Sequence, residues 1–76
     1  MKASIKYFGM IAEKLNRDSE ILEIIPGMNL KAFIEYKYPE LKEMEFKIAI
    51  NKELRDEIKP GEEELEIAVL PPFAGG

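Results

Sequence analysis

Residues 29–39 read NLKAFIEYKYP and predict the main helix of this chain. Asn29 is well suited to cap a helix that begins at Leu30, because its side-chain oxygen can accept a hydrogen bond from a backbone N–H of the first turn. The apolar positions at helical spacing are Leu30, Phe33, Ile34 and Tyr38. Pro39 ends the helix, since proline lacks a backbone N–H and disfavours the helical conformation in the residue before it.

Strands are predicted on both sides of this helix, because apolar and polar residues alternate there with the period of two that places one face on a core. The predicted strands are residues 3–8, 19–25, 46–50 and 64–70, with a short edge segment around Leu54. A short second helix is predicted over residues 9–15, where Ile11 and Leu15 lie four positions apart. Turns are predicted at Pro26-Gly27 and Pro60-Gly61.

These elements predict an α+β fold of two layers, a mixed sheet of four to five strands with the main helix on one face. A chain of 76 residues is too short for two cores, so we expect a single domain over residues 1–76. Residues 70–76 are expected to leave it as a flexible, extended C-terminal tail.

Composition excludes several classes of function. The chain has no histidine and no cysteine, which removes thiolate nucleophiles, imidazole bases and zinc sites built from these ligands. The net charge of −4 argues against nucleic-acid binding and favours a protein partner with a basic face. The acidic run at Glu62-Glu63-Glu64 is interpreted as a solvated surface. No signal peptide or membrane segment is predicted, so we expect a cytoplasmic protein.

The last six residues, Pro71-Pro72-Phe73-Ala74-Gly75-Gly76, do not continue the strand alternation. Two prolines favour an extended backbone, and the terminal glycines add almost no width. At about 3.3–3.6 Å per residue, such a tail reaches at most roughly 20 Å, enough to enter a buried site in another protein. Its carboxylate needs a leaving group before acyl chemistry, and no phosphate-binding loop for ATP is present. A frayed terminus remains the alternative interpretation.

Several segments match the pattern of a known family. They are Lys6-Tyr7-Phe8-Gly9 with Ala12-Glu13, Tyr38-Pro39, Ile48-Ala49-Ile50-Asn51, Pro60-Gly61-Glu62, and Leu70-Pro71-Pro72-Phe73-Ala74-Gly75-Gly76. On these residues the chain resembles the MoaD/ThiS family of sulfur carriers, most closely the small subunits of molybdopterin synthases. The resemblance spans essentially the whole chain, and the Pro-Pro-x-x-Gly-Gly terminus is its most specific part.

The resemblance implies a ubiquitin-like β-grasp fold and a role in molybdenum cofactor biosynthesis. A separate ubiquitin-activating-like enzyme would adenylate Gly76 with ATP and magnesium, and a sulfur donor protein would convert it to a thiocarboxylate. The tail would then insert into the large synthase subunit, within a heterotetramer, and donate sulfur to the cyclic pyranopterin precursor. The family pattern places catalysis on the large subunit, so this chain would be a non-catalytic carrier that binds no cofactor or metal itself.

The same likeness assigns roles to individual residues. Gly76 would carry the sulfur, and Gly75 with Ala74 would let the tail thread a narrow channel. The neck gripped by both partners would be Pro71, Pro72 and Phe73. Phe8 and Leu70 belong either to the apolar patch that relatives press against their partners or to the core.

Two positions depart from the family pattern, and other functions stay open. Relatives often have a smaller residue such as Val where Phe73 stands, and Arg where Ala12 stands. A carrier for thiazole synthesis or tRNA thiolation, or a ubiquitin-like protein modifier, would use the same Gly76, although the Pro-Pro pair favours molybdopterin synthase. A non-catalytic ubiquitin-like binding module is the alternative from another class. A free-standing enzyme is disfavoured, because no paired acid–base arrangement can be assigned.

Overall fold

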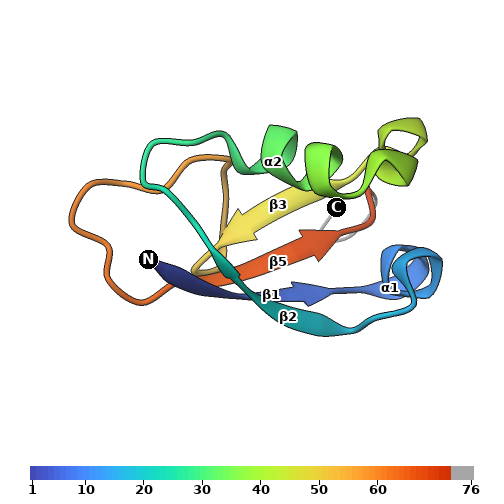
Figure 1. Ribbon diagram of the computed structural model, residues 1–76, viewed down its shortest axis with the longest axis horizontal. Coiled ribbons are helices and arrows are strands. Elements are labelled where there is room, and N and C mark those ends of the chain that lie inside the picture. The colour runs from blue at the N-terminus through green and yellow to red at the C-terminus, as the bar shows by residue number, and fades with distance from the viewer. Residues whose placement is uncertain (73–76) are drawn as a thin grey trace.

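The structure is a computed structural model that describes residues 1–72. Its elements in chain order are β1 (Lys2–Tyr7), α1 (Gly9–Leu15), β2 (Ser19–Glu23), α2 (Leu30–Lys37), the 3₁₀ helix η1 (Pro39–Glu43), β3 (Lys47–Ile50), β4 (Glu53–Leu54) and β5 (Glu66–Leu70). Figure 1 shows α2 and η1 lying along one face of the sheet, with α1 at one end of it. The predicted two-layer α+β arrangement is confirmed.

The five strands form one mixed sheet in the order β2-β1-β5-β3-β4. β5 is the central strand, parallel to β1 and antiparallel to β3. The register sets Lys6 beside Ala68 and Ala49 beside Ala68 from the other side. The last strand of the chain is therefore held by neighbours on both edges, and its C-terminal end has a fixed position.

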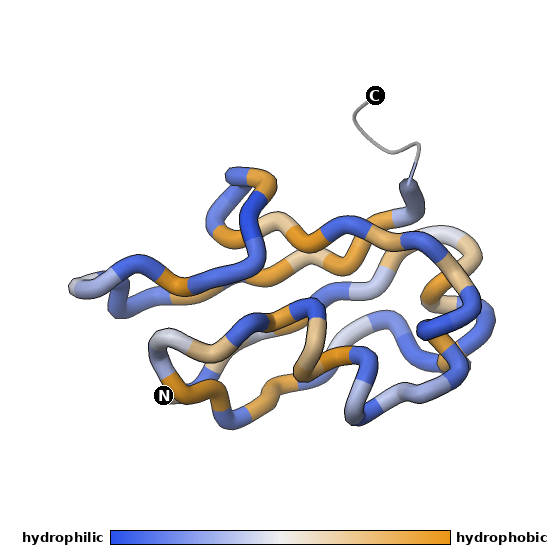
Figure 2. Tube along the Cα trace, turned by 90° about the horizontal axis from the view of Figure 1, so that it is seen from above, coloured by the Kyte–Doolittle hydropathy of each residue, from blue (hydrophilic) through white to orange (hydrophobic). Residues whose placement is uncertain are grey.

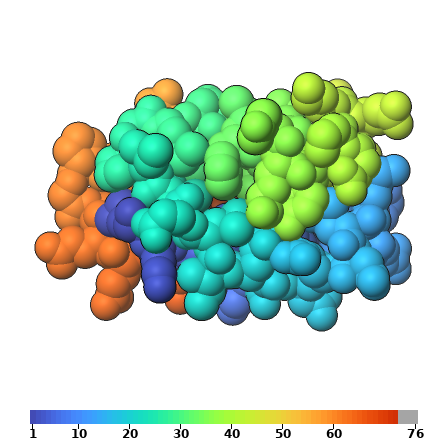
Figure 3. All heavy atoms as spheres, viewed as in Figure 1, coloured from blue at the N-terminus to red at the C-terminus, as the bar shows by residue number. Residues whose placement is uncertain are grey.

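The core lies between the sheet and the helices. Its fully buried large side chains are Ile5, Ile11, Ile24, Leu30, Ile34, Leu41, Ile50, Ile67 and Val69. They come from strands and helices alike, and Figure 2 shows hydrophobic and hydrophilic positions alternating along the trace. In Figure 3 the atoms of α2, η1 and β2 largely hide the central strands β3 and β5, so this face of the sheet is covered.

The main helix begins where its sequence predicts. The Asn29 side-chain oxygen accepts a hydrogen bond from the Ala32 N–H at 2.9 Å, and Leu30 and Ile34 are buried. Phe33 and Tyr38 pack against the core while staying partly exposed. The helix ends at Lys37, two residues before Pro39, as the proline argument requires.

Several strand boundaries differ from the prediction. β1 is Lys2–Tyr7 instead of residues 3–8, β3 begins at Lys47 instead of residue 46, and β5 begins at Glu66 instead of residue 64. β2 ends at Glu23 instead of residue 25, because its partner strand β1 begins at Lys2, which pairs with Glu23, and because Ile25 is exposed next to Pro26, which has no N–H for a ladder. Pro39 also starts an unpredicted 3₁₀ helix that buries Leu41. Proline is tolerated in a first helical turn, where its missing N–H would have no helical partner.

Within residues 1–72, no helix is both long enough and apolar enough to cross a membrane.

Candidate functional site

The central strand β5 fixes the position of Pro71 and Pro72, the first two residues after it, which we call the tail root. β5 ends at Leu70, whose partner in β3 is Lys47, and the next residue, Pro71, is buried. Pro72 is partly buried. The two prolines follow the end of β5 and belong to the packed part of the molecule.

Pro71 packs against the start of α1. Phe8 donates its backbone N–H to the Val69 carbonyl at 3.2 Å, which brings the β1–α1 junction beside the end of β5. Gly9 follows with φ +55°, and a Cβ built on it would lie 3.1 Å from Pro71 Cγ. A side chain at position 9 would press on the proline ring, so glycine serves both the backbone conformation and the close approach.

The residues that the sequence assigns to the site fall in three places. Pro71 and Pro72 form the packed root, while Phe8 is 43% exposed and so is not a core residue. Leu70 is partly buried and shares a sheet face with Ala68, because side chains alternate along a strand. Phe73, Ala74, Gly75 and Gly76 lie outside the described residues.

We call the face of the sheet opposite α2 and η1 the open face. Its residues, which follow from the register and from exposure, are Lys2, Ser4, Lys6, Ser19, Ile21, Glu23, Lys47, Ala49, Glu66, Ala68 and Leu70. No helix of residues 1–72 covers it. The open face extends along β5 to Leu70, the residue directly before Pro71.

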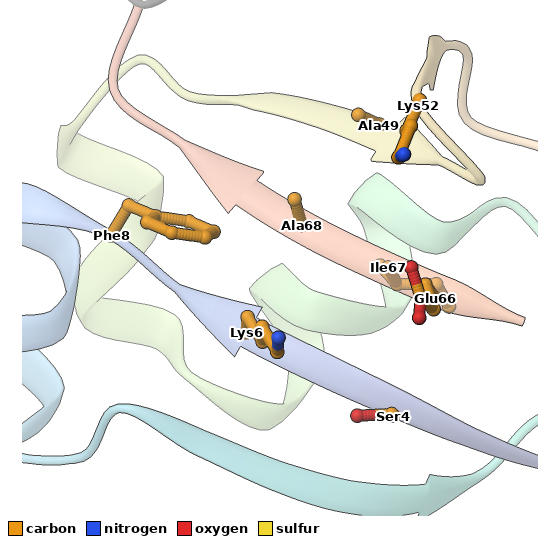
Figure 4. Close-up of a pocket in the computed structure, with 8 residues that line it drawn as sticks. All are labelled: Ser4, Lys6, Phe8, Ala49, Lys52, Glu66, Ile67 and Ala68. Carbon is orange, nitrogen blue, oxygen red and sulfur yellow. The ribbon is translucent and has the colours of Figure 1, made fainter.

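A shallow hollow of about 210 Å³ lies in the middle of the open face. Ala68 and Ala49 form its floor, and Figure 4 shows the Phe8 ring at one end, pointing along β5 toward Ala68. Lys6 and Lys52 stand on opposite sides of β5. Small-molecule sites are usually larger, roughly 300–1,000 Å³, so the size favours a single side chain of a protein partner.

The turn after β3 places Lys52 at the edge of this hollow. Asn51 and Lys52 both have left-handed backbone angles, φ 49° and 70°. The Asn51 side chain holds this turn: its oxygen accepts from the Glu66 N–H at 2.9 Å, and its nitrogen donates to Glu62 Oε2 at 3.0 Å and to the Glu64 carbonyl at 3.1 Å. Asparagine tolerates this conformation better than most residues, and the three hydrogen bonds stabilise it.

Glu62 is the centre of a hydrogen-bonded cluster on the loop between β4 and β5. We call Glu62, Arg55 and the Lys59 N–H the clasp. Arg55 donates to both carboxylate oxygens, at 2.8 Å and 2.6 Å, and the Lys59 N–H donates at 2.7 Å. These hydrogen bonds, that of Arg55 above all, lower the pKa of Glu62 to about 2. The expectation of a solvated acidic run therefore fails for Glu62 and fits Glu63 and Glu64, which are exposed.

A second polar cluster lies on the helix side, near the end of β1. Tyr7 and Tyr38 each donate a hydroxyl hydrogen bond of 2.5 Å to Glu20 Oε2, and their rings meet edge to face at 5.9 Å. Burial opposes ionisation of Glu20, but the two hydroxyl donors and Arg17 outweigh it and lower the pKa of that carboxyl. Burial and the adjacent carboxylate raise the pKa of Tyr7. Every polar atom here has a partner, so we assign the cluster to stability.

The sequence analysis assigned no role to Gly9 or Lys52, or to Ala49 and Ala68, which form the floor of the hollow. The alternation in residues 64–70 does place Ala68 on the face away from the core, and that signal could have found it. Gly9 and Lys52 carry no comparable signal, because their positions depend on contacts between segments distant in the sequence.

No family model and no curated protein matches this chain. Among solved structures, the chain is similar to a protein of Pyrococcus furiosus described as "Putative molybdopterin converting factor, subunit 1". The likeness has a TM-score of 0.74 and covers 95% of this chain and 98% of that one, at 20% sequence identity.

The chain has the ubiquitin-like β-grasp fold. This confirms the fold that the family resemblance implies. An identity of 20% establishes the architecture alone, so the chemistry has to be argued from the tail and its surroundings.

Proposed function

We propose that this chain is a sulfur carrier for molybdenum cofactor biosynthesis, acting as the small subunit of a molybdopterin synthase. The carboxylate of Gly76 would be its working group. The observation that carries the proposal is the tail root: the central strand β5 leads directly into buried Pro71, and the sequence after Pro72 reads Phe73-Ala74-Gly75-Gly76.

The chemistry needs an activated carboxylate. Ionised carboxylates are poor electrophiles, so the Gly76 carboxylate would first attack the α-phosphate of ATP on a separate enzyme, releasing pyrophosphate and leaving an acyl adenylate. Sulfur at the sulfide level, delivered by a sulfur donor, would then attack the acyl carbon and displace AMP, leaving a thiocarboxylate. The large synthase subunit would hold the pyranopterin precursor while the thiocarboxylate sulfur bonds to a carbon of it, and hydrolysis of the resulting thioester would leave the sulfur on the precursor and release the Gly76 carboxylate.

The fold and the surface both support this assignment. A neighbour of the same fold is described as a subunit of a molybdopterin converting factor, a name that implies a further subunit. The open face with its hollow is continuous with the tail root, so one partner could grip the domain and receive the tail together. Phe8 is then a contact residue beside the hollow, and Leu70 lies between the hollow and the prolines.

A mass measurement tests the proposal. The chain with Gly76 as its last residue is incubated with the cognate adenylating enzyme, ATP, magnesium and a sulfur donor. We expect its intact mass to rise by the difference between one sulfur and one oxygen atom. Deleting Gly76, or adding one alanine after it, should prevent this while the thermal midpoint stays unchanged, because the hydrophobic core of residues 1–72 is built from side chains between Ala3 and Val69.

Further measurements in the same experiment distinguish among the sulfur-carrier pathways, and between a sulfur carrier, a protein modifier and a binding module. The loaded chain should transfer sulfur to the pyranopterin precursor with the large synthase subunit and not to the substrate of a thiazole synthase or a tRNA-thiolating enzyme. An isopeptide-linked product would instead indicate a protein modifier. If the wild-type chain is never loaded by an adenylating enzyme active on a known carrier, a binding module is the better assignment.

A further inference from the structure

The open face carries a charge opposite to that of the whole chain. The chain has a net charge of −4. The open face together with the lining of its hollow, however, carries four lysines and two glutamates: Lys2, Lys6, Lys47, Lys52, Glu23 and Glu66. Most carboxylates therefore lie on the helix side and in the loops. The net charge alone predicts a partner with a basic face, and the local distribution predicts the reverse.

The lysines nearest the hollow are available to a partner. Lys6 and Lys52 are exposed, and among residues 1–72 neither forms an ion pair with a carboxylate. The basic residues elsewhere in the loops are used differently, since Arg55 is held by Glu62 and Arg17 by Glu20. Lys52 is also presented by a backbone conformation that three Asn51 hydrogen bonds maintain.

The hollow between these lysines selects for an apolar group. Its floor is formed by the methyl groups of Ala68 and Ala49, the Phe8 ring closes one end, and Ser4 and Glu66 line the part away from Phe8. In protein interfaces, hollows of this kind become buried when they receive an anchoring side chain of the partner. The charged residues around them set the orientation and the rate of association. A nucleic acid would use the lysines but would leave the apolar floor without a matching group.

We propose that the open face docks an acidic protein surface, with one apolar side chain of the partner seated over Ala68 between Lys6 and Lys52 and partner carboxylates facing the two ammonium groups. This inference rests on the proposed function, because the partners in question are those that load and receive the tail. The inference therefore predicts the surface of those partners: each should dock on the open face with an apolar residue that is surrounded by acidic residues.

Charge reversal tests the inference, with a single lysine of the opposite layer as the control for position. The double variant K6E/K52E changes two exposed side chains of the open face, and K42E changes an exposed lysine of η1 on the opposite layer. Binding to the cognate adenylating enzyme and to the large synthase subunit is measured at several salt concentrations. We expect K6E/K52E to weaken binding about tenfold or more at low salt and to reduce the salt dependence, because complementary rim charges steer association. K42E should bind as the wild type does.

A second variant tests the apolar half. Ala68→Leu fills the hollow without changing charge, so it should weaken binding at all salt concentrations while the salt dependence stays as in the wild type. Circular dichroism and the thermal midpoint of each variant show whether the fold is retained.

The outcomes separate this inference from the proposed function. Wild-type binding with K6E/K52E equal to K42E overturns the acidic-surface inference and leaves the carrier proposal standing. Wild-type chain that binds neither protein refutes the carrier proposal and this inference with it. Binding of poly(U) RNA that K6E/K52E abolishes, with unchanged affinity for both proteins, would assign the lysines to nucleic acid and would also overturn the inference.

Discussion

Gly9 connects the β1–α1 junction to the place where the chain leaves the sheet. Its φ of +55° disfavours side chains, and its missing Cβ leaves room for the ring of Pro71. Since Pro71 is buried, the ring cannot move aside freely. A single residue of the first turn of α1 thus determines how closely the tail root packs against the domain.

Replacing Gly9 by alanine tests this contact. We expect Gly9→Ala to lower the free energy of unfolding by about 1–2 kcal/mol, the usual cost of a left-handed non-glycine residue, with a further loss from the pressure on Pro71. Gly27→Ala is the matched control, because Gly27 has φ +91° with nothing within 4 Å of the added Cβ. Urea unfolding gives the stability, and NMR shifts of Leu70 and Pro71 report the tail root. Equal losses and unchanged shifts would contradict the contact.

Residue-level prediction succeeds where a position depends on its own strand or helix. The alternation places Ala3, Ile5 and Tyr7 in the core, and all three are buried. It fails where a partner lies far along the chain. Nothing in the acidic run at residues 62–64 distinguishes Glu62 from its neighbours, because the clasp depends on Arg55, seven residues earlier in a loop.

At the scale of elements, the cap of α2 is the clearest local determinant. The carbonyl oxygen of the Asn29 side chain satisfies the Ala32 N–H, one of the donors that a helix leaves unpaired at its start. The same residue precedes buried Leu30, whose N–H bonds the Asp56 carbonyl at 2.8 Å. The cap therefore fixes both the first turn of α2 and its register against the loop after β4.

Asn29→Ala should cost about 1 kcal/mol of stability, because it removes a side-chain cap. Asn29→Asp keeps the acceptor and adds a negative charge at the helix N-terminus, so it should stay within a few tenths of the wild type. Chemical denaturation of the three proteins at neutral pH measures the difference. Similar losses in both variants would show that the cap hydrogen bond does not contribute.

Element existence could be predicted from periodicity, and element ends could not. Both α-helices begin and end close to their predicted residues, since Asn29 and Pro39 are local signals for α2, and α1 is capped by Asn16, a residue type that tolerates the left-handed backbone found there. η1 escaped prediction because residues 39–43 are too short to show a helical period. β4 is only two residues long, and its place at the sheet edge depends on pairing with Ala49 and Ile50.

At the scale of the whole molecule, charge is sorted by face. The covered side and its loops hold most carboxylates, several of them in hydrogen-bonded clusters, and the open face holds lysines that form no ion pair within residues 1–72. Composition gives only the sum of these charges. Which face carries which sign depends on strand register, so the sequence predicted the fold of this surface and missed the sign of its charge.

The carboxylate clusters also predict how stability depends on pH. Glu62 has a pKa of about 2 in the folded protein against an ordinary value of 4.5. The unfolded chain therefore binds more protons in this interval, and stability should fall as pH drops from about 4.5 toward 2. The lowered pKa of Glu20 acts in the same direction. At the alkaline end, Tyr7 and Tyr38 stay protonated in the folded state, so stability should fall as pH rises above about 10.

Urea unfolding across this pH range, followed by circular dichroism, measures the free energy of unfolding at each pH. It gives both the fall in stability at low pH, the acid limb, and the fall at high pH, the alkaline limb. Glu62→Gln should flatten the acid limb, because the variant has no carboxyl to protonate, and it should lower stability at neutral pH, where the ionic contact with Arg55 is lost. Glu63→Gln changes an exposed neighbour whose side chain has no hydrogen bond within residues 1–72, and it should retain the wild-type acid limb. Tyr7→Phe should reduce the alkaline limb, and it should also weaken the acid limb slightly, because it removes one of the hydroxyl donors that lower the pKa of Glu20. Acid limbs of equal slope in the two glutamine variants would mean that the clasp does not couple protonation to folding.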